Sequence, residues 1–307
     1  MLREKDIELQ NDNHIMEMFL SSGNRSKYTA RNYVRAIQQF REVMNDKSLH
    51  EITWKDIEAY KCGLISGKYS KSGRRLSAAS IASLIAPLRS LYKWGDDPNI
   101  GIFKHNPTTA VRIPKVQVNS HNHFLTKKEV SRILHQLRSQ GKRDYLIGLA
   151  LVLLGLRVSE LVSISWSDFH TDAAESSMWL TIVNGKGGRR RDVKVPQLLW
   201  SVLKDQYENN LKTTQANKRV FPLTIRQVER IIEQARNKIV LHKKVTPHWL
   251  RHTNATLALL HGATLQQVQH NLGHAQINTT QRYLHTVEQI EKAAPDFVED
   301  SLREFLK

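Results

Sequence analysis

The sequence predicts a mainly α-helical protein of two domains, with a small β-hairpin in the second. Apolar residues recur at helical spacing over most of the chain, one Asn-Gly pair lies between two β-prone runs, and 307 residues usually divide into two domains. The chain carries 46 lysines and arginines against 29 aspartates and glutamates, a formal charge of +17. A surplus of this size predicts a polyanionic partner, and nucleic acid is favoured over an anionic membrane.

The positive charge is concentrated in the middle of the chain. Residues 1–20 hold 2 basic and 5 acidic side chains, and residues 284–307 hold 3 and 6. Residues 21–283 therefore hold 41 basic and 18 acidic side chains, a net charge of +23. We expect this middle part to bind nucleic acid with strong salt dependence, and the acidic ends to face solvent or protein.

Several classes of protein are disfavoured by the sequence. The longest uncharged apolar run, residues 145–156, is shorter than the roughly 20 residues that span a bilayer, so no membrane segment is expected. The N-terminus lacks the apolar region of a secretory signal, and the single cysteine, Cys62, cannot form an internal disulfide. These features favour a cytoplasmic protein. No phosphate-binding glycine loop follows a predicted strand, so a nucleotide cofactor is not expected.

We expect residues 1–116 to form a helical, basic DNA-binding domain. The segment from Tyr28 predicts a helix with a core face and a basic flank that includes Arg31 and Arg35, both candidate DNA contacts. A capping-box pair at Thr53 and Asp56 predicts a second helix.

Two features mark the end of this first domain. An apolar segment over residues 76–94 predicts a third helix, which Pro87 should kink or divide. Beyond it the helical period is lost and prolines recur, so the linker is placed at residues 117–123.

The second domain is expected over residues 124–307. Thr126 and Glu129 form a capping-box pattern, and a buried helix should follow over about residues 143–154. The alternating runs 178–183 and 190–195 flank Asn184-Gly185, which predicts a hairpin with Lys186 in or beside its turn. Later helix starts are expected at Thr246 with Pro247 in the first turn, and at the capping-box pair Thr264 and Gln267.

Histidines at helical spacing raise the question of a metal site. His248 and His252 lie four residues apart on one predicted helix. A zincin motif would have glutamate after the first histidine, where this chain has Trp249, and Arg251 would bring a positive charge close to a bound cation. We therefore expect no metal, and His252 is interpreted as a surface or supporting histidine.

Five sequence elements occur together over about 130 residues. They are Gly-Leu-Arg-Val-Ser-Glu-Leu at 155–161, the hairpin with Lys186, His-x-x-Arg at 248–251, Leu-Gly-His at 272–274, and Thr-Thr-x-x-Tyr ending at Tyr283. In this order they resemble the signature of the tyrosine recombinase (phage integrase) family, and the chain length resembles that of the Xer-like and simple integrases. The resemblance covers the second domain.

The resemblance implies a role for each matching residue. Tyr283 matches the nucleophile, which would hold the 3′ phosphate of a cleaved DNA strand. Arg157 and Arg251 match the two arginines that bind the scissile phosphate, and Glu160 matches an acidic residue that supports the first of them.

Three further positions match the family's proton-transfer and phosphate-binding residues. His248 matches the histidine that helps to accept the tyrosine proton. His274 matches the position that hydrogen-bonds the scissile phosphate, and Lys186 matches the lysine that protonates the leaving 5′ hydroxyl.

The chemistry of these residue types is consistent with those roles. A side-chain nucleophile keeps the energy of the phosphodiester in a covalent bond, so strand rejoining needs no ATP, and neither a metal nor another cofactor is required. A phenol has a pKa near about 10 and must lose its proton as it attacks, while charge gathers on the phosphate oxygens. The planar guanidinium of arginine matches two of those oxygens.

Each residue also has an ordinary interpretation when taken alone. Arg157 and Glu160 could form a surface ion pair, and Lys186 could be a solvated loop lysine, with Lys194 on the same hairpin as an alternative. The hairpin arginines could form a phosphate-contacting patch; these are Arg189, Arg190 and Arg191. The conjunction of the five elements favours the catalytic interpretation.

The resemblance implies a clamp of two domains around DNA: a helical, SAM-like core-binding domain and a mixed α/β catalytic domain. The implied reaction is site-specific recombination by two rounds of strand exchange through 3′-phosphotyrosyl intermediates and a Holliday junction. The implied assembly is a homotetramer on two duplexes of double-stranded DNA, with accessory DNA-bending proteins as possible further partners. A type IB topoisomerase-like relaxing enzyme and a DNA-binding protein with a decayed catalytic site are the alternatives.

The segment after Tyr283 predicts a terminal helix. Apolar residues from Val287 to Phe305 recur at roughly helical intervals. Such a helix either packs on its own domain or docks on a neighbour, and the resemblance favours exchange between protomers.

Overall fold

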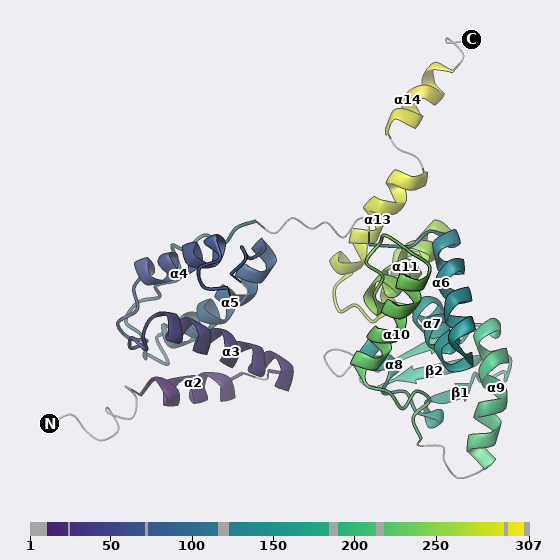
Figure 1. Cartoon of the computed structure of the whole chain (residues 1–307), viewed down its shortest axis with the longest axis horizontal. Coiled ribbons are helices and arrows are strands. Elements are labelled where there is room, and N and C mark those ends of the chain that lie inside the picture. Colours follow the sequence, from purple (N-terminus) through teal and green to yellow (C-terminus); the bar gives the residue numbers. More distant parts are fainter. Residues whose placement is uncertain are drawn as a thin grey trace. The chain divides into compact units, whose positions relative to one another are not determined.

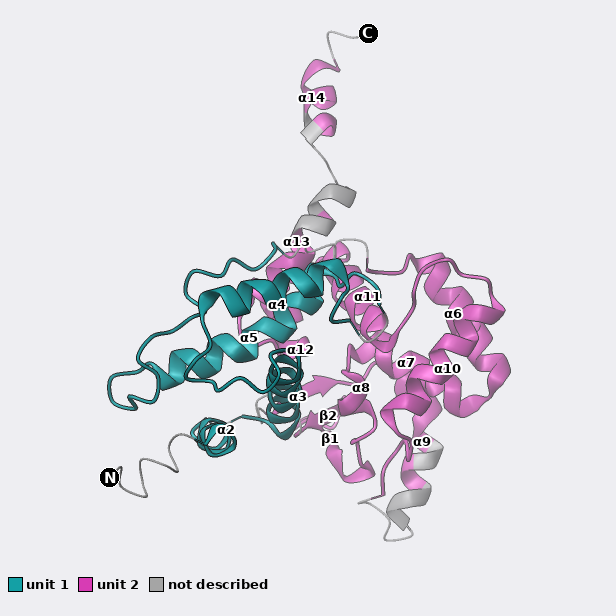
Figure 2. Cartoon of the chain, turned by 60° about the vertical axis from the view of Figure 1, so that its left-hand side comes forward, with its two compact units in different colours: residues 1–118 teal, residues 119–307 magenta. Residues whose placement is uncertain are grey.

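The computed structural model describes residues 11–23, 25–70, 73–115, 123–183, 190–212, 218–291 and 294–303. The chain divides into two compact units, residues 1–118 and 119–307 (Figures 1 and 2). Its described elements are mainly helices, with one three-stranded sheet, so the predicted fold class is confirmed. Among these residues, no helix is both long and apolar enough to cross a membrane.

The first unit is built from four described helices around one core. They are α2 (Asp12–Ser21), α3 (Lys27–Val43), α4 (Trp54–Ser66) and α5 (Ala78–Gly95). The predicted capping box at Thr53 and Asp56 is confirmed, since the Thr53 amide donates to Asp56 Oδ2 at 2.8 Å. Arg31 and Arg35 are exposed on α3, whereas Ile37 and Phe40 on the same helix are fully buried.

The expected division of the third helix at Pro87 is wrong. Helix α5 runs unbroken from Ala78 to Gly95 with Pro87 inside it. Proline removes one backbone hydrogen bond from a helix interior. The buried neighbours Ile85, Leu88 and Leu91 pack into the unit's core, and this burial offsets the lost bond.

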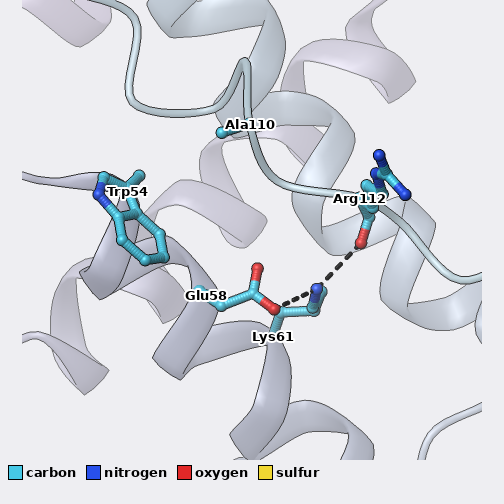
Figure 3. Close-up of a pocket in the computed structure, with 5 residues that line it drawn as sticks. All are labelled: Trp54, Glu58, Lys61, Ala110 and Arg112. Carbon is cyan, nitrogen blue, oxygen red and sulfur yellow. Dashed lines mark hydrogen bonds and ion pairs between the residues drawn. The ribbon is translucent and has the colours of Figure 1, made fainter.

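The first unit has an open hollow between α4 and the segment that follows α5 (Figure 3). Trp54 lies at one side with 53% of its surface exposed. Lys61 bridges the hollow, because its ammonium group pairs with Glu58 at 2.5 Å and donates to the Arg112 carbonyl at 3.0 Å. None of the predicted catalytic residues lines this hollow.

The second unit is centred on α7. Its helices are α6 (Lys127–Gln140), α7 (Lys142–Leu154), α8 (Val158–Leu161), α9 (Gln197–Lys212), α10 (Ile225–Lys238), α11 (Pro247–Leu260), α12 (Leu265–Leu272), α13 (Ile277–Glu291) and α14 (Ala294–Leu302). Helix α7 is buried on nearly all sides and contacts α6, α9, α10 and α11. The predicted caps at Thr126, Thr246 and Thr264 are all present.

An antiparallel sheet lies beside these helices. The 3₁₀ turn η2 (Trp166–Asp168) leads into β1 (Phe169–Thr171), which pairs with β2 (Met178–Ile182), and β2 pairs with β3 (Arg191–Lys194). The predicted pairing of the two hairpin runs is confirmed, with Leu180 opposite Val193. The turn with Lys186 and Arg189 lies outside the described residues.

A second small core joins α11, α12 and α13. It contains Leu259, Val268, Leu272 and Val287 together with Tyr283, which is 9% exposed. Tyr283 lies within α13, and the described residues of the predicted terminal helix are helical, in α13 and α14.

Candidate active site

Three guanidinium groups surround the carboxylate of Glu160, which is 1% exposed. Arg191 donates to its two oxygens at 2.9 and 2.8 Å, and Arg157 Nη1 lies 2.7 Å from Oε1. Arg251 Nη1 lies 3.8 Å from Oε2. Burial opposes ionisation of Glu160, but the hydrogen bonds and charges of Arg191 and Arg157 outweigh it and lower its pKa. The carboxylate is therefore charged at neutral pH.

Local sequence brings Arg157 and Glu160 together. Helix α7 ends at Gly155 in the left-handed conformation, with φ +62°, and Arg157 is then the N-cap of α8. The Arg157 amide donates to Glu160 Oε2 at 2.8 Å. The Arg157 side chain keeps 25% of its surface exposed, so it can reach a phosphate while it is held by Glu160.

Arg251 is the second predicted phosphate-binding arginine, and it is 2% exposed. It lies on α11 and donates to the Gly155 carbonyl at 2.5 Å and to the Leu272 carbonyl. Burial, followed by the charge of Arg157, lowers its pKa to about 10, so it remains a cation at neutral pH. These bonds join the ends of α7 and α12 around one positive charge.

Two asparagines that sequence reasoning missed complete this arrangement. Asn254 donates to the carbonyls of Val152 and Leu153 at 2.8 and 3.0 Å. Asn271 donates to the carbonyl of Leu154 at 3.3 Å and to Asn254 Oδ1 at 3.2 Å. They satisfy carbonyl groups that the end of α7 would otherwise leave without partners. In the sequence, the position of Asn254 three residues after Arg251 was the one feature that could have indicated its role.

Arg191 requires a correction. It was expected to belong to a phosphate-contacting patch, but its side chain is 6% exposed and is committed to protein partners. Besides Glu160 it binds the Asn271 carbonyl, through Nε at 3.0 Å. A guanidinium held by these bonds supports Glu160 and links β3 to α12. Arg190 is exposed, and its Nη2 donates a 3.5 Å hydrogen bond to Thr181 Oγ1.

A row of aromatic rings contains the predicted nucleophile. His248 and His252 meet on α11 with ring centroids 4.2 Å apart, and the His252 ring lies 5.3 Å from that of Tyr283. The His274 ring is nearly parallel to that of Tyr283, with centroids 6.4 Å apart. Its Nδ1 is 2.9 Å from the hydroxyl of buried Thr280. His248, His274 and Tyr283 are thus brought together as the sequence predicts.

The histidines of this row are held in their neutral form. Burial is the first cause of the lowered pKa of His248, and the charges of Arg251 and Arg157 add to it. The pKa of His274 falls to about 4 and that of His252 to about 3 for the same first reason. Burial raises the pKa of Tyr283, and the positive charges of Arg251 and Arg157 oppose this increase.

One contact near the row was also missed. The ring of His123 stacks on that of Trp249 with centroids 4.8 Å apart. His123 lies at the end of the predicted linker, and its proximity to α11 depends on packing between distant segments.

Metal binding finds no support in the described residues. They contain no group of three or more histidines, cysteines, aspartates or glutamates that could hold an ion.

Lys194, the alternative to Lys186 on the hairpin, is exposed on β3.

Two family models together match most of the chain. Residues 123–289 match the phage integrase family, and residues 16–95 match the phage integrase N-terminal SAM-like domain.

The chain belongs to the phage integrase family.

Curated relatives of this family match nearly the full length. The chain is 31% identical to a tyrosine recombinase of Pseudothermotoga lettingae, over 86% of this chain and 89% of the relative. It is 30% identical to tyrosine recombinase XerC of Bacillus subtilis, over 85% and 87%. Membership makes the chain an enzyme that cleaves and rejoins DNA strands, which favours the predicted recombinase over the two alternatives.

Solved structures show the same fold at lower identity. A lambda integrase dimer bound to a COC' core site matches with a TM-score of 0.67 and 24% identity, over 91% of this chain and 79% of that chain. XerH site-specific recombinase bound to a palindromic difH substrate matches with a TM-score of 0.67 and 19% identity, over 97% and 85%.

Proposed function

We propose that this phage integrase family member carries out site-specific recombination with Tyr283 as nucleophile. The single observation behind this proposal is that the Tyr283 ring packs near His252 and His274, with centroids 5.3 and 6.4 Å away, in the same unit as the arginines held by Glu160. The tyrosine oxygen attacks a DNA phosphorus, the bond to the 5′ oxygen breaks, and a 3′-phosphotyrosyl link forms.

The proton transfers balance this step. His248, neutral because burial lowers its pKa, accepts the proton of the Tyr283 hydroxyl. Lys186 donates a proton to the departing 5′ oxygen. Rejoining is the reverse reaction, in which a 5′ hydroxyl of the partner strand attacks the phosphotyrosyl bond, so no external energy source is used.

Positive charge and hydrogen bonds stabilise the transition state. Arg157, whose side chain is partly exposed, binds the non-bridging oxygens, where negative charge accumulates. Arg251 is buried with its Nη atoms on the Gly155 and Leu272 carbonyls, and it contributes its positive charge to the site. If the Thr280 hydroxyl donates to Nδ1 of His274, Nε2 carries the proton and donates to the same phosphate. Glu160 and Arg191 fix the position of Arg157. Removal of one preorganised hydrogen-bond donor to the phosphate typically costs roughly 3–4 kcal/mol of transition-state stabilisation.

The domain roles follow from the two families matched. We propose residues 1–116 as the core-binding domain, 117–123 as the linker and 124–307 as the catalytic domain. Exposed Arg31 and Arg35 on α3, together with Arg189 and Arg190 of the hairpin, contact the DNA backbone in this proposal.

The active assembly we propose is a homotetramer on two duplexes that passes through a Holliday junction. A solved lambda integrase tetramer bound to a Holliday junction has the same fold, with a TM-score of 0.65. Helix α14 offers apolar surface for exchange between protomers, because Val298 is 57% and Leu302 43% exposed. We also propose a cytoplasmic location for the enzyme, and DNA-bending proteins are candidate accessory factors.

A covalent-capture experiment tests the nucleophile. DNA bound by the purified protein is sequenced to find the site, and a nicked substrate is built so that the released fragment diffuses away. Wild-type protein should accumulate a covalent adduct on denaturing gels, and Tyr283→Phe should bind the same DNA without forming it. An adduct that persists in Tyr283→Phe would refute this assignment, and its absence in DNA-bound wild-type protein would refute the enzyme.

A further inference from the structure

His252 occupies a place in the site to which no catalytic role was assigned. It lies on α11 one helical turn after His248, so both rings are on the same helix face. The centroid of the His252 ring lies 4.2 Å from that of His248 and 5.3 Å from that of Tyr283. It is therefore the side chain that connects the proposed proton acceptor with the proposed nucleophile.

A buried nitrogen of this ring lacks a partner in the part of the chain that the structure describes. Nδ1 of His252 is shielded from solvent and has no hydrogen bond there. An unpaired buried polar atom costs free energy that an apolar ring at the same position would not cost. Since Nδ1 makes no hydrogen bond there, the contacts of His252 with His248 and Tyr283 are packing between rings, which a phenyl ring could also make.

The surroundings also keep His252 uncharged. Burial is the first cause of its pKa of about 3, and the groups that face it are His248, His123, Arg251 and His274. From α13, the Tyr283 ring packs against it. A protonated ring 4.2 Å from His248 would make His248 a weaker proton acceptor, so neutrality at this position preserves the basicity of its neighbour.

We propose that His252 is a positioning residue for strand cleavage, a ring that orients Tyr283 and His248 toward each other. This inference rests on the proposed function of Tyr283. It predicts that the cleavage rate depends mainly on the shape of the ring. Phe at position 252 fills the same space. Ala or Gln removes the ring that packs on Tyr283 and admits water beside His248. A small displacement of reacting groups can reduce a rate by about 100-fold, so a measurable loss is expected.

The test measures single-turnover cleavage of the nicked substrate at saturating DNA. His252→Ala should cleave about tenfold or more slowly, and His252→Phe should recover most of the rate. DNA affinity should be unchanged in both. His252→Gln serves as a second ringless variant if the Ala variant does not fold, and His135→Ala, an exposed histidine on α6, is the matched control.

The pH profile separates positioning from a general loss of stability. His248 must be neutral to accept a proton, and burial together with Arg251, Arg157 and His123 lowers its pKa. Arg282 lies on the Tyr283 side, where its charge lowers the tyrosine pKa. Water admitted in His252→Ala would raise the pKa of His248 toward about 6.5, so the acid limb of the rate should move to higher pH, whereas His252→Phe should keep the wild-type limb.

The outcomes distinguish this inference from the proposed function. Ringless variants that cleave at the wild-type rate with an unshifted acid limb would overturn the role of His252 while Tyr283 stands. A His252→Phe variant as slow as His252→Ala would overturn the role of ring shape. Wild-type protein that binds DNA but forms no adduct would instead overturn the proposed function.

Discussion

Arg191 at the start of β3 holds Glu160 of α8, with its two Nη atoms 2.9 and 2.8 Å from the two carboxylate oxygens. The two residues are 31 positions apart. Through this pair, β3 fixes the carboxylate that in turn holds Arg157 at 2.7 Å. The proposed phosphate-binding site is therefore braced by a buried charge network that reaches beyond the sequence motif.

The buried pair predicts a large effect of Glu160→Ala. Three guanidinium groups would lose their common anion, and removal of one partner of a buried ion pair typically costs about 3–5 kcal/mol. Urea unfolding should show this loss, and cleavage should fall with it. Glu208→Gln, which removes an exposed pair with Lys204 on α9, should cost less than about 1 kcal/mol. Equal effects of the two variants would contradict the network.

Two glycines provide a matched test of the Leu-Gly-His element. Gly273 and Gly262 both have positive φ, +63° and +84°. A Cβ at Gly273 would lie 2.9 Å from the Arg191 side chain, whereas one at Gly262 would meet nothing within 4 Å. Gly262→Ala should cost only the conformational penalty of about 1–2 kcal/mol, and Gly273→Ala should cost more and slow cleavage as well. Equal unfolding free energies would contradict a contact role for Gly273.

As pH falls, the second unit should lose stability at pH values above those at which most carboxylates become protonated. The folded-state pKa of His274 is about 4 and that of His252 about 3, against an unfolded value of about 6.5. Between these values the unfolded chain binds more protons, so stability should fall as pH drops from about 6.5 toward 4. Glu160, whose folded pKa is lowered, contributes stability above its unfolded value of about 4.3 that is lost as pH falls through the folded pKa.

Urea midpoints between pH 7.5 and 4 check this dependence. His274→Gln should give a shallower decline than wild type across the upper part of the range. A midpoint that stays constant from pH 7 to 5 in wild-type protein would show that these histidines are not held neutral by the fold.

The exposed apolar residues of α14 predict a role in assembly. A chain that stops after Glu291 keeps Tyr283 and α13 but lacks Val298 and Leu302. It should bind a single DNA site as wild type does and fail to form tetramers on paired sites, as measured by sedimentation. Val298→Asp in the full-length chain tests the same surface, and Arg303→Ala is the matched control at the end of that helix. Truncated protein that still forms tetramers on paired sites would refute the role of α14.

The sequence by itself determined the local features of this protein. Capping patterns located the starts of α4, α6, α11 and α12, because an N-cap and its partner lie within three residues of each other. The Asn-Gly pair between alternating runs indicated the pairing of β2 with β3. Arg157 and Glu160 could be paired in advance because their contact spans one turn.

Only the tertiary structure decided which distant side chains meet. The assignment of Arg191 to Glu160 depends on the register of β3, and a register shifted by one residue would have turned Arg190 inward instead. The bonds from Asn254 on α11 and Asn271 on α12 to the end of α7 depend on how these helices pack, as do the contacts of His252 with His248 and Tyr283. Such contacts arise from burial of a whole core, which no short stretch of sequence encodes.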